Sequence, residues 1–182
     1  MRIGAAIFVT ALGLTSARPA DARDDLSPVG LLQRACFDTG LNANSLERMA
    51  RAERWRSTSS TPDFRRPAWA FAYRVGAHTV MLARIATAGD VTENGIGTVC
   101  TVNTERPPAR WRSDIEALAA SHDLDDSSTA EVPPGFAPIQ VWSGQNGYTL
   151  SAAYRALPAA LSMSLSRQVV TESQEPSPAE ER

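Results

Sequence analysis

Residues 69–102 read WAFAYRVGAHTVMLARIATAGDVTENGIGTVCTV, and this stretch predicts a three-stranded antiparallel meander. In its first strand Trp69, Phe71 and Tyr73 alternate with alanine, so the three aromatic side chains share one face. We expect that face to pack in the core; the alternative is an open aromatic surface that binds a flat ligand. The middle strand, residues 79–88, is apolar on both faces, which favours a central strand covered on both sides.

The third strand of this meander carries Cys100, and the only other cysteine, Cys36, lies on a helical pattern far upstream. In an oxidising compartment two cysteines most simply form a disulfide, which here would fasten a helix to the sheet. The bond would close a loop of 64 residues, worth about 4 kcal/mol through the entropy of the unfolded chain. The alternative is a redox or metal-binding pair, but neither a Cys-x-x-Cys motif nor a neighbouring histidine supports it.

The start of the chain predicts export to an oxidising compartment. Arg2 precedes an apolar run at residues 4–14 that has signal-peptide length and is too short to span a bilayer as a helix. Residues 20–22 read ADA and place small side chains at a signal-peptidase site, so residues 1–22 are predicted to be a signal peptide. Residues 15–17 offer a second cleavage site. We therefore expect a periplasmic or secreted protein without a transmembrane segment in the mature chain.

Composition argues against nucleic acid as a partner. All 18 basic residues are arginine, and 20 acidic residues give a net charge of −2. Such a balance lacks the basic footprint of a protein that binds DNA or RNA. No motif indicates a cofactor. We expect one domain at residues 23–170, followed by a disordered acidic tail at residues 171–182, which is rich in Glu, Ser and Pro.

Patterns on either side of the meander complete an α+β fold. Ser27 and Pro28 predict a helix start, and capping boxes that begin at Asn44 and Ser113 predict two more helices. Three further strands are expected at residues 139–142, 147–154 and 161–166, the last with a serine face toward water. The prediction is therefore an antiparallel sheet of about six strands in two meanders, packed against helices on one face. Each meander follows a capped helix, which suggests an internal repeat.

Six arginines form the most prominent polar cluster in the sequence. They are Arg48, Arg51, Arg54, Arg56, Arg65 and Arg66. Because few acidic residues lie between them, they predict a local basic surface that binds an anionic partner, such as an acidic protein, a lipid head group or an envelope polymer. The alternative is a solvated helix face whose arginines pair with acids elsewhere.

Two histidines and one acidic segment are the other candidates for chemistry. His78 is predicted at a hairpin turn and His122 on the apolar face of a helix, so we expect an ordinary turn residue and a packed or capping residue. The segment 122–126 lacks the glycine of a calcium loop, so no metal site is predicted. It opens a long loop, residues 123–138. Ser143 lacks the preceding glycine and the strand–elbow–helix context of a hydrolase nucleophile.

Three short patterns carry a resemblance. They read Ala35-Cys36-x-x-Thr39-Gly40, then Leu46-x-x-Met49-Ala50 with Trp55, then Val99-Cys100-x-Val102. Over residues 27–125 the chain resembles small exported proteins of high-GC proteobacteria that have no assigned function. The resemblance implies a soluble periplasmic domain with one disulfide. It implies no activity and no catalytic residue.

We therefore predict a non-catalytic binding or interaction module of the periplasm, with an envelope protein or an anionic envelope component as its partner. The alternative is a small periplasmic hydrolase or ligand-modifying enzyme that uses His78 or His122. Such an enzyme requires a histidine in a concave pocket with a carboxylate or hydroxyl within hydrogen-bond reach. A binding module requires an exposed arginine or aromatic surface instead. A purely structural envelope protein would lack that surface and self-associate.

Overall fold

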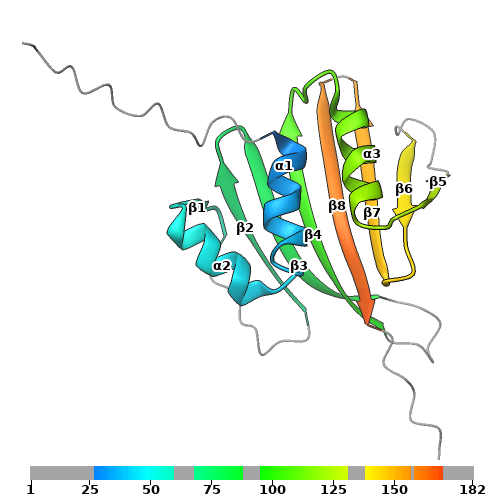
Figure 1. The fold of residues 1–182 in the computed structure, drawn as a ribbon. Helices are drawn as coiled ribbons and strands as arrows, with labels where there is room; N and C mark the ends of the chain where they lie inside the picture. The colour runs from blue at the N-terminus through cyan, green and yellow to red at the C-terminus, as the bar shows by residue number, and fades with distance from the viewer. Residues whose placement is uncertain (1–26, 60–67, 88–94, 131–137, 157, 170–182) are drawn as a thin grey trace, which may run out of the picture.

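An eight-stranded antiparallel sheet forms the body of the protein (Figure 1). The computed structural model describes residues 27–59, 68–87, 95–130, 138–156 and 158–169; the predicted signal peptide and acidic tail lie outside these ranges. The strand order is β1-β2-β3-β4-β8-β7-β6-β5. The strands are β1 (Arg56–Ser57), β2 (Trp69–Val75), β3 (His78–Thr87), β4 (Gly95–Glu105), β5 (Asp126–Ala130), β6 (Ile139–Ser143), β7 (Tyr148–Arg155) and β8 (Ala160–Val169).

The helical segments lie on one face of the sheet (Figure 1). They are α1 (Pro28–Leu32), the π-helix η1 (Gln33–Phe37), α2 (Ala43–Ala52) and α3 (Trp111–Ser121). Contacts join α1 to β4, to β8 and to α3, so the first helix lies over the middle of the sheet. The predicted α+β class with an antiparallel sheet is confirmed.

The chain builds the sheet from two meanders that meet at its centre. In the first, β1 to β4 follow α2, and in the second, β5 to β8 follow α3. The last strands of the two meanders, β4 and β8, pair antiparallel along ten residue pairs from Ile96↔Val169 to Glu105↔Ala160. Each half is therefore a helix followed by four antiparallel strands, which agrees with the two similar halves expected from the helix and strand patterns.

The predicted count of about six strands is too low, because both edge strands were missed. β1 falls at the start of a stretch that reads as a polar loop, and β5 falls inside the predicted loop at residues 123–138. Every residue of β1 is exposed, as are four of the five in β5. Strands that bury no face show no alternation of apolar and polar residues, so hydrophobic periodicity does not detect them. Pairing with β2 and β6 defines them instead.

Helix starts were predicted with mixed success. The Ser27 cap is confirmed, since its Oγ accepts a hydrogen bond of 3.0 Å from the backbone N–H of Gly30. The cap of the second helix lies two residues before the predicted one, because Asn42 caps α2 by accepting a hydrogen bond of 3.0 Å from the N–H of Ser45. The capping box predicted at Ser113 is wrong, because Ser113 lies inside α3 and its Oγ donates to the carbonyl of Arg110.

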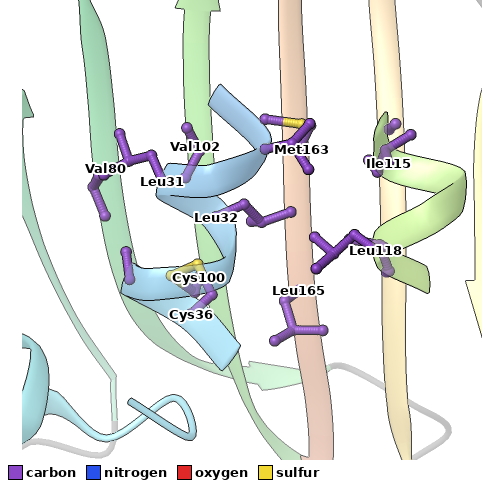
Figure 2. Packing of buried hydrophobic residues seen from close by; sticks show 14 of the residues in the cluster. Leu31, Leu32, Cys36, Val80, Cys100, Val102, Ile115, Leu118, Met163 and Leu165 are labelled. Atoms are coloured by element: carbon purple, nitrogen blue, oxygen red, sulfur yellow. A yellow bond between two sulfur atoms is a disulfide. The ribbon is translucent and has the colours of Figure 1, made fainter. Parts of the chain in front are cut away.

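A π-helical turn links α1 to α2 and places Cys36 over the sheet. The Oγ1 of Thr39 donates 2.7 Å to the carbonyl of Ala35, and the N–H of Leu41 donates 3.1 Å to the carbonyl of Cys36. These bonds close the end of the helical segment. The predicted disulfide between Cys36 and Cys100 is present, with Cα atoms 5.6 Å apart and both residues fully buried (Figure 2). It fastens η1 to β4.

The core lies between the helices and the sheet. One register row crosses six strands and consists of Phe71, Leu82, Cys100, Leu165, Leu150 and Trp142, all buried. Above this row, Leu32 of α1 and Leu118 of α3 converge over β8 (Figure 2). Trp69 and Tyr73 are partly buried and pack against this core, so the predicted burial of the aromatic face of β2 is confirmed.

The opposite face of the sheet carries small and hydroxyl-bearing side chains. Thr101 and Ser164 are cross-strand partners whose side-chain oxygens lie 2.9 Å apart, and Ser151 is next in the same row. The serine face predicted for residues 161–166 is thus confirmed. The prediction that β3 is covered on both faces is wrong, because the described helices cover one face and Ile85 is 43% exposed on the other. Apolar residues on an interior strand do not require a second layer.

Candidate functional site: an arginine surface and a separate cleft

Four of the six predicted arginines lie together on α2 and just beyond it. Arg48 and Arg51 project from the exposed side of α2, while Leu46 and Ala50 on its other side are buried in the core. Arg54 follows the helix and Arg56 lies on β1, and both are exposed. Arg65 and Arg66 lie outside the described residues.

A fifth exposed arginine lies at the same edge of the sheet and was not predicted from the sequence. Arg74 of β2 is the cross-strand partner of Arg56 and is exposed. Neighbouring side chains on paired strands lie close together, so the two guanidinium groups concentrate positive charge at this edge of the sheet. The pairing depends on β1, whose two exposed residues show no strand pattern, so the sequence offered no signal for it. Because Arg74 alternates with the core-facing Tyr73 and Val75, Arg56 and Arg74 project from the face of the sheet opposite to the helices. We call the five arginines of this edge, on both of its sides, the arginine surface; they are Arg48, Arg51, Arg54, Arg56 and Arg74.

Acidic residues neutralise only part of the arginine surface. Glu47 accepts a hydrogen bond of 2.6 Å from Arg51, a pair that is exposed on the arginine side. Glu53 pairs with Arg34, which lies outside the surface. Within the described residues, no carboxylate forms an ion pair with the other four arginines. Four guanidinium groups of the arginine surface therefore have no acidic partner in this part of the chain.

The arginine surface contains a shallow polar cleft of about 390 Å³. Its lining comprises Asn42, Asn44, Ser45, Glu47, Arg48 and Arg51. Amide, hydroxyl and guanidinium groups dominate this lining, so the cleft suits a hydrated, hydrogen-bonding ligand group rather than an apolar one.

The arginine surface is electrically coupled to Tyr73 of β2. Burial raises the pKa of Tyr73, the charge of Glu47 raises it further, and Arg51 opposes both effects. The folded protein therefore holds the phenol proton of Tyr73 more tightly than the unfolded chain does. The contribution of this group to the free energy of unfolding is complete below the ordinary tyrosine pKa. It is lost as the pH rises through the raised pKa.

A titration of phenolate absorbance should therefore contain a transition for Tyr73 at higher pH than that of an ordinary tyrosine. Tyr73→Phe should remove that late transition, and Glu47→Gln should shift it to lower pH. If the titration curve of Tyr73→Phe keeps the same late transition, the environment described for Tyr73 is wrong.

His122 has a structural environment. It caps the C-terminal end of α3, its ring stacks on Phe37 with centroids 3.8 Å apart, and its Nε2 lies 2.8 Å from Oε1 of Gln33. Gln33 in turn donates 2.6 Å to Asp38. Within the described residues, no carboxylate or hydroxyl hydrogen-bonds to the His122 ring. The predicted packed or capping role is confirmed, and the ring fastens α3 to η1.

His78 and the acidic segment do not assemble into a site with His122. His78 is half-buried beside the β2–β3 turn, where its cross-strand partners are Val75 and Thr104. Among the described residues, no three of the types His, Cys, Asp and Glu are grouped closely enough to hold a metal ion. Ser143 ends β6, and Gly144 follows it in the hairpin turn that was predicted there.

A second cleft, of about 410 Å³, lies between the N-terminal end of α3 and the outer strands β5, β6 and β7. Its lining is Trp111, Arg112, Thr129, Pro138, Gln140, Ala152 and Tyr154. Sequence analysis missed this cleft because its residues come from four separate segments. Neither histidine lines either of the two clefts described here.

Comparison of the chain with protein-family models, with curated protein sequences and with solved structures finds no match. Within the part of the chain that the structure describes, none of the helices has the length and apolarity needed to cross a membrane.

Proposed function

We propose that this protein is a non-catalytic binding module of the cell envelope that engages an anionic component through the arginine surface. The observation that carries the proposal is the exposure of five arginines on α2, β1 and β2, of which only Arg51 has an acidic partner among the described residues. Guanidinium groups form strong, bidentate hydrogen bonds to phosphate and carboxylate groups. Arg48, Arg51 and Arg54 lie within seven consecutive residues at the end of α2, and Arg56 and Arg74 extend the positive charge to the other side of the same edge.

The proposed location is the periplasm or the exterior of the cell. The apolar run at residues 4–14 supports export, and the buried Cys36–Cys100 disulfide is typical of oxidising compartments. A module in that compartment meets acidic lipids, acidic polymers and acidic proteins at high local concentration. The arginine surface suits all three by charge, and the test below separates lipid from lipid-free polyanions.

The test uses the mature chain with two defined probes, vesicles that contain phosphatidylglycerol and soluble dextran sulfate. We expect binding to at least one probe at low ionic strength and progressive loss as salt is added, because exposed charges are screened. The double variant Arg51→Glu/Arg54→Glu should bind at least about tenfold more weakly than the wild type.

A matched control is Arg106→Glu/Arg155→Glu, which changes the net charge equally at two exposed arginines elsewhere. This control should retain most of the binding. Equal loss in both double variants would show that only net charge matters and would overturn the assignment to the arginine surface. Absence of binding to both probes would overturn the proposed function.

A further inference from the structure

The cleft beside α3 has a floor and a wall of different chemistry. Thr129, Gln140 and Ala152 are register neighbours across β5, β6 and β7, so they form one continuous row on the helix side of the sheet. Ala152 is buried and leaves room above it, while Thr129 and Gln140 offer a hydroxyl and an amide. The floor therefore combines a shallow apolar centre with two hydrogen-bonding groups.

An aromatic pair forms the wall of this cleft. The rings of Trp111 and Tyr154 stack with centroids 5.7 Å apart at an interplanar angle of 29°. Trp111 is only 9% exposed and belongs to the buried core, so it holds the half-buried Tyr154 in place. Stacked rings anchored in a core present a rigid, flat apolar surface to the cleft.

Arg112 supplies the only charge in the lining. Its guanidinium carbon lies 5.5 Å from the centroid of the Trp111 ring, an arrangement that favours a fixed position for the cation. The neighbouring acid Asp114 is engaged by Arg110 at 3.5 Å, and within the described chain no carboxylate pairs with Arg112. A cleft with one unpaired guanidinium group and no acidic lining favours a ligand that carries an anionic group.

We propose that this cleft binds a sugar acid, that is, a pyranose ring that carries a carboxylate. The C–H face of the ring packs against the aromatic wall, the carboxylate pairs with Arg112, and the ring hydroxyls hydrogen-bond to Thr129 and Gln140. Purely aromatic acids lack the hydroxyls that these two side chains would satisfy. The site lies at the β5 edge of the sheet, opposite the β1 edge that carries the arginine surface, and it stands independently of the function proposed above.

The test measures binding of galacturonic acid and of its linear trimer to the mature wild-type chain by calorimetry and by amide chemical shifts. We expect saturable binding of the trimer and at least about tenfold weaker binding of the galactose trimer, which lacks the carboxylate. Binding of the monomer with the same affinity as the trimer would identify a free sugar acid as the ligand. Tighter binding of the trimer would identify an acidic polysaccharide.

Two variants locate the site. Arg112→Gln should weaken binding of the trimer at least about tenfold, because it removes the charged hydrogen bonds to the carboxylate. Arg48→Gln, at an exposed arginine near the opposite edge of the sheet, should bind like the wild type. Thr129→Val removes one hydroxyl and should weaken binding without altering the melting temperature, since Thr129 is exposed. The proposal is overturned if the wild type binds no trimer, if the neutral trimer binds equally well, or if Arg112→Gln binds like the wild type.

Discussion

Cys100→Ser is expected to lower the free energy of unfolding by about 4 kcal/mol relative to the oxidised wild type. The disulfide joins η1 to β4 across a separation of 64 residues, and both cysteines are fully buried. Cutting this link releases a long loop in the unfolded chain, and the gained entropy favours unfolding. Since whole domains are stable by roughly 5–15 kcal/mol, the loss is a large fraction of the total. Urea denaturation monitored by circular dichroism measures it.

The same bond is removed by Cys36→Ser and by the double variant, so all three should show nearly equal losses rather than additive ones. Reduction of the wild type provides a control that changes no residue, and it should reproduce most of the effect. Additive losses in the two single variants would show that packing of each side chain, and not the covalent link, dominates. Unchanged midpoints in all variants would mean that the bond does not form.

Leu32→Ala is expected to cost about 3–5 kcal/mol, as found for leucines truncated in well-packed cores. Leu32 is fully buried, and its side chain lies between α1 and β8, where it converges with Leu118 of α3 (Figure 2). Truncation leaves a cavity where the first helix, the centre of the sheet and α3 meet. Because β4 and β8 join the two halves at this point, the cavity weakens both halves at once.

Ile85→Ala is the matched control. Ile85 also lies on an interior strand, but it is 43% exposed on the face that the described helices do not cover. Its truncation should cost less than about 1 kcal/mol. A small effect at Leu32 together with a large one at Ile85 would contradict the packing of helices on one face of the sheet.

Helix boundaries show how far local signals reach. The Ser27 cap was predicted correctly because Ser followed by Pro has few other roles. The capping boxes at Asn44 and Ser113 were misplaced, since Asn42 caps α2 and α3 begins at Trp111. Trp111 is buried in the core and stacks on Tyr154, which is 43 residues further along the chain. This packing favours a start of α3 at Trp111, two residues before Ser113. A tertiary contact thus overrides a local capping preference.

The arginine surface was predicted in part for a similar reason. Arg48 and Arg51 stand on the polar side of an amphipathic helix, and that side is visible in the sequence. Arg74 lies beside Arg56 only through the pairing of β1 with β2. The cleft lined by Arg112 was not foreseen at all, because it forms where α3 meets the row made by β5, β6 and β7.

The sequence by itself determined the α+β class, the antiparallel meanders, the helix-to-strand disulfide and the buried aromatic face of β2. Each of these follows from a local period of two or 3.6 residues, or from the presence of only two cysteines. Only the tertiary structure decided the pairing of β4 with β8, the two exposed edge strands and the cleft beside α3. These features depend on hydrogen bonds and contacts between segments far apart in the chain. Such contacts produce no hydrophobic periodicity in either segment, so the sequence pattern does not show them.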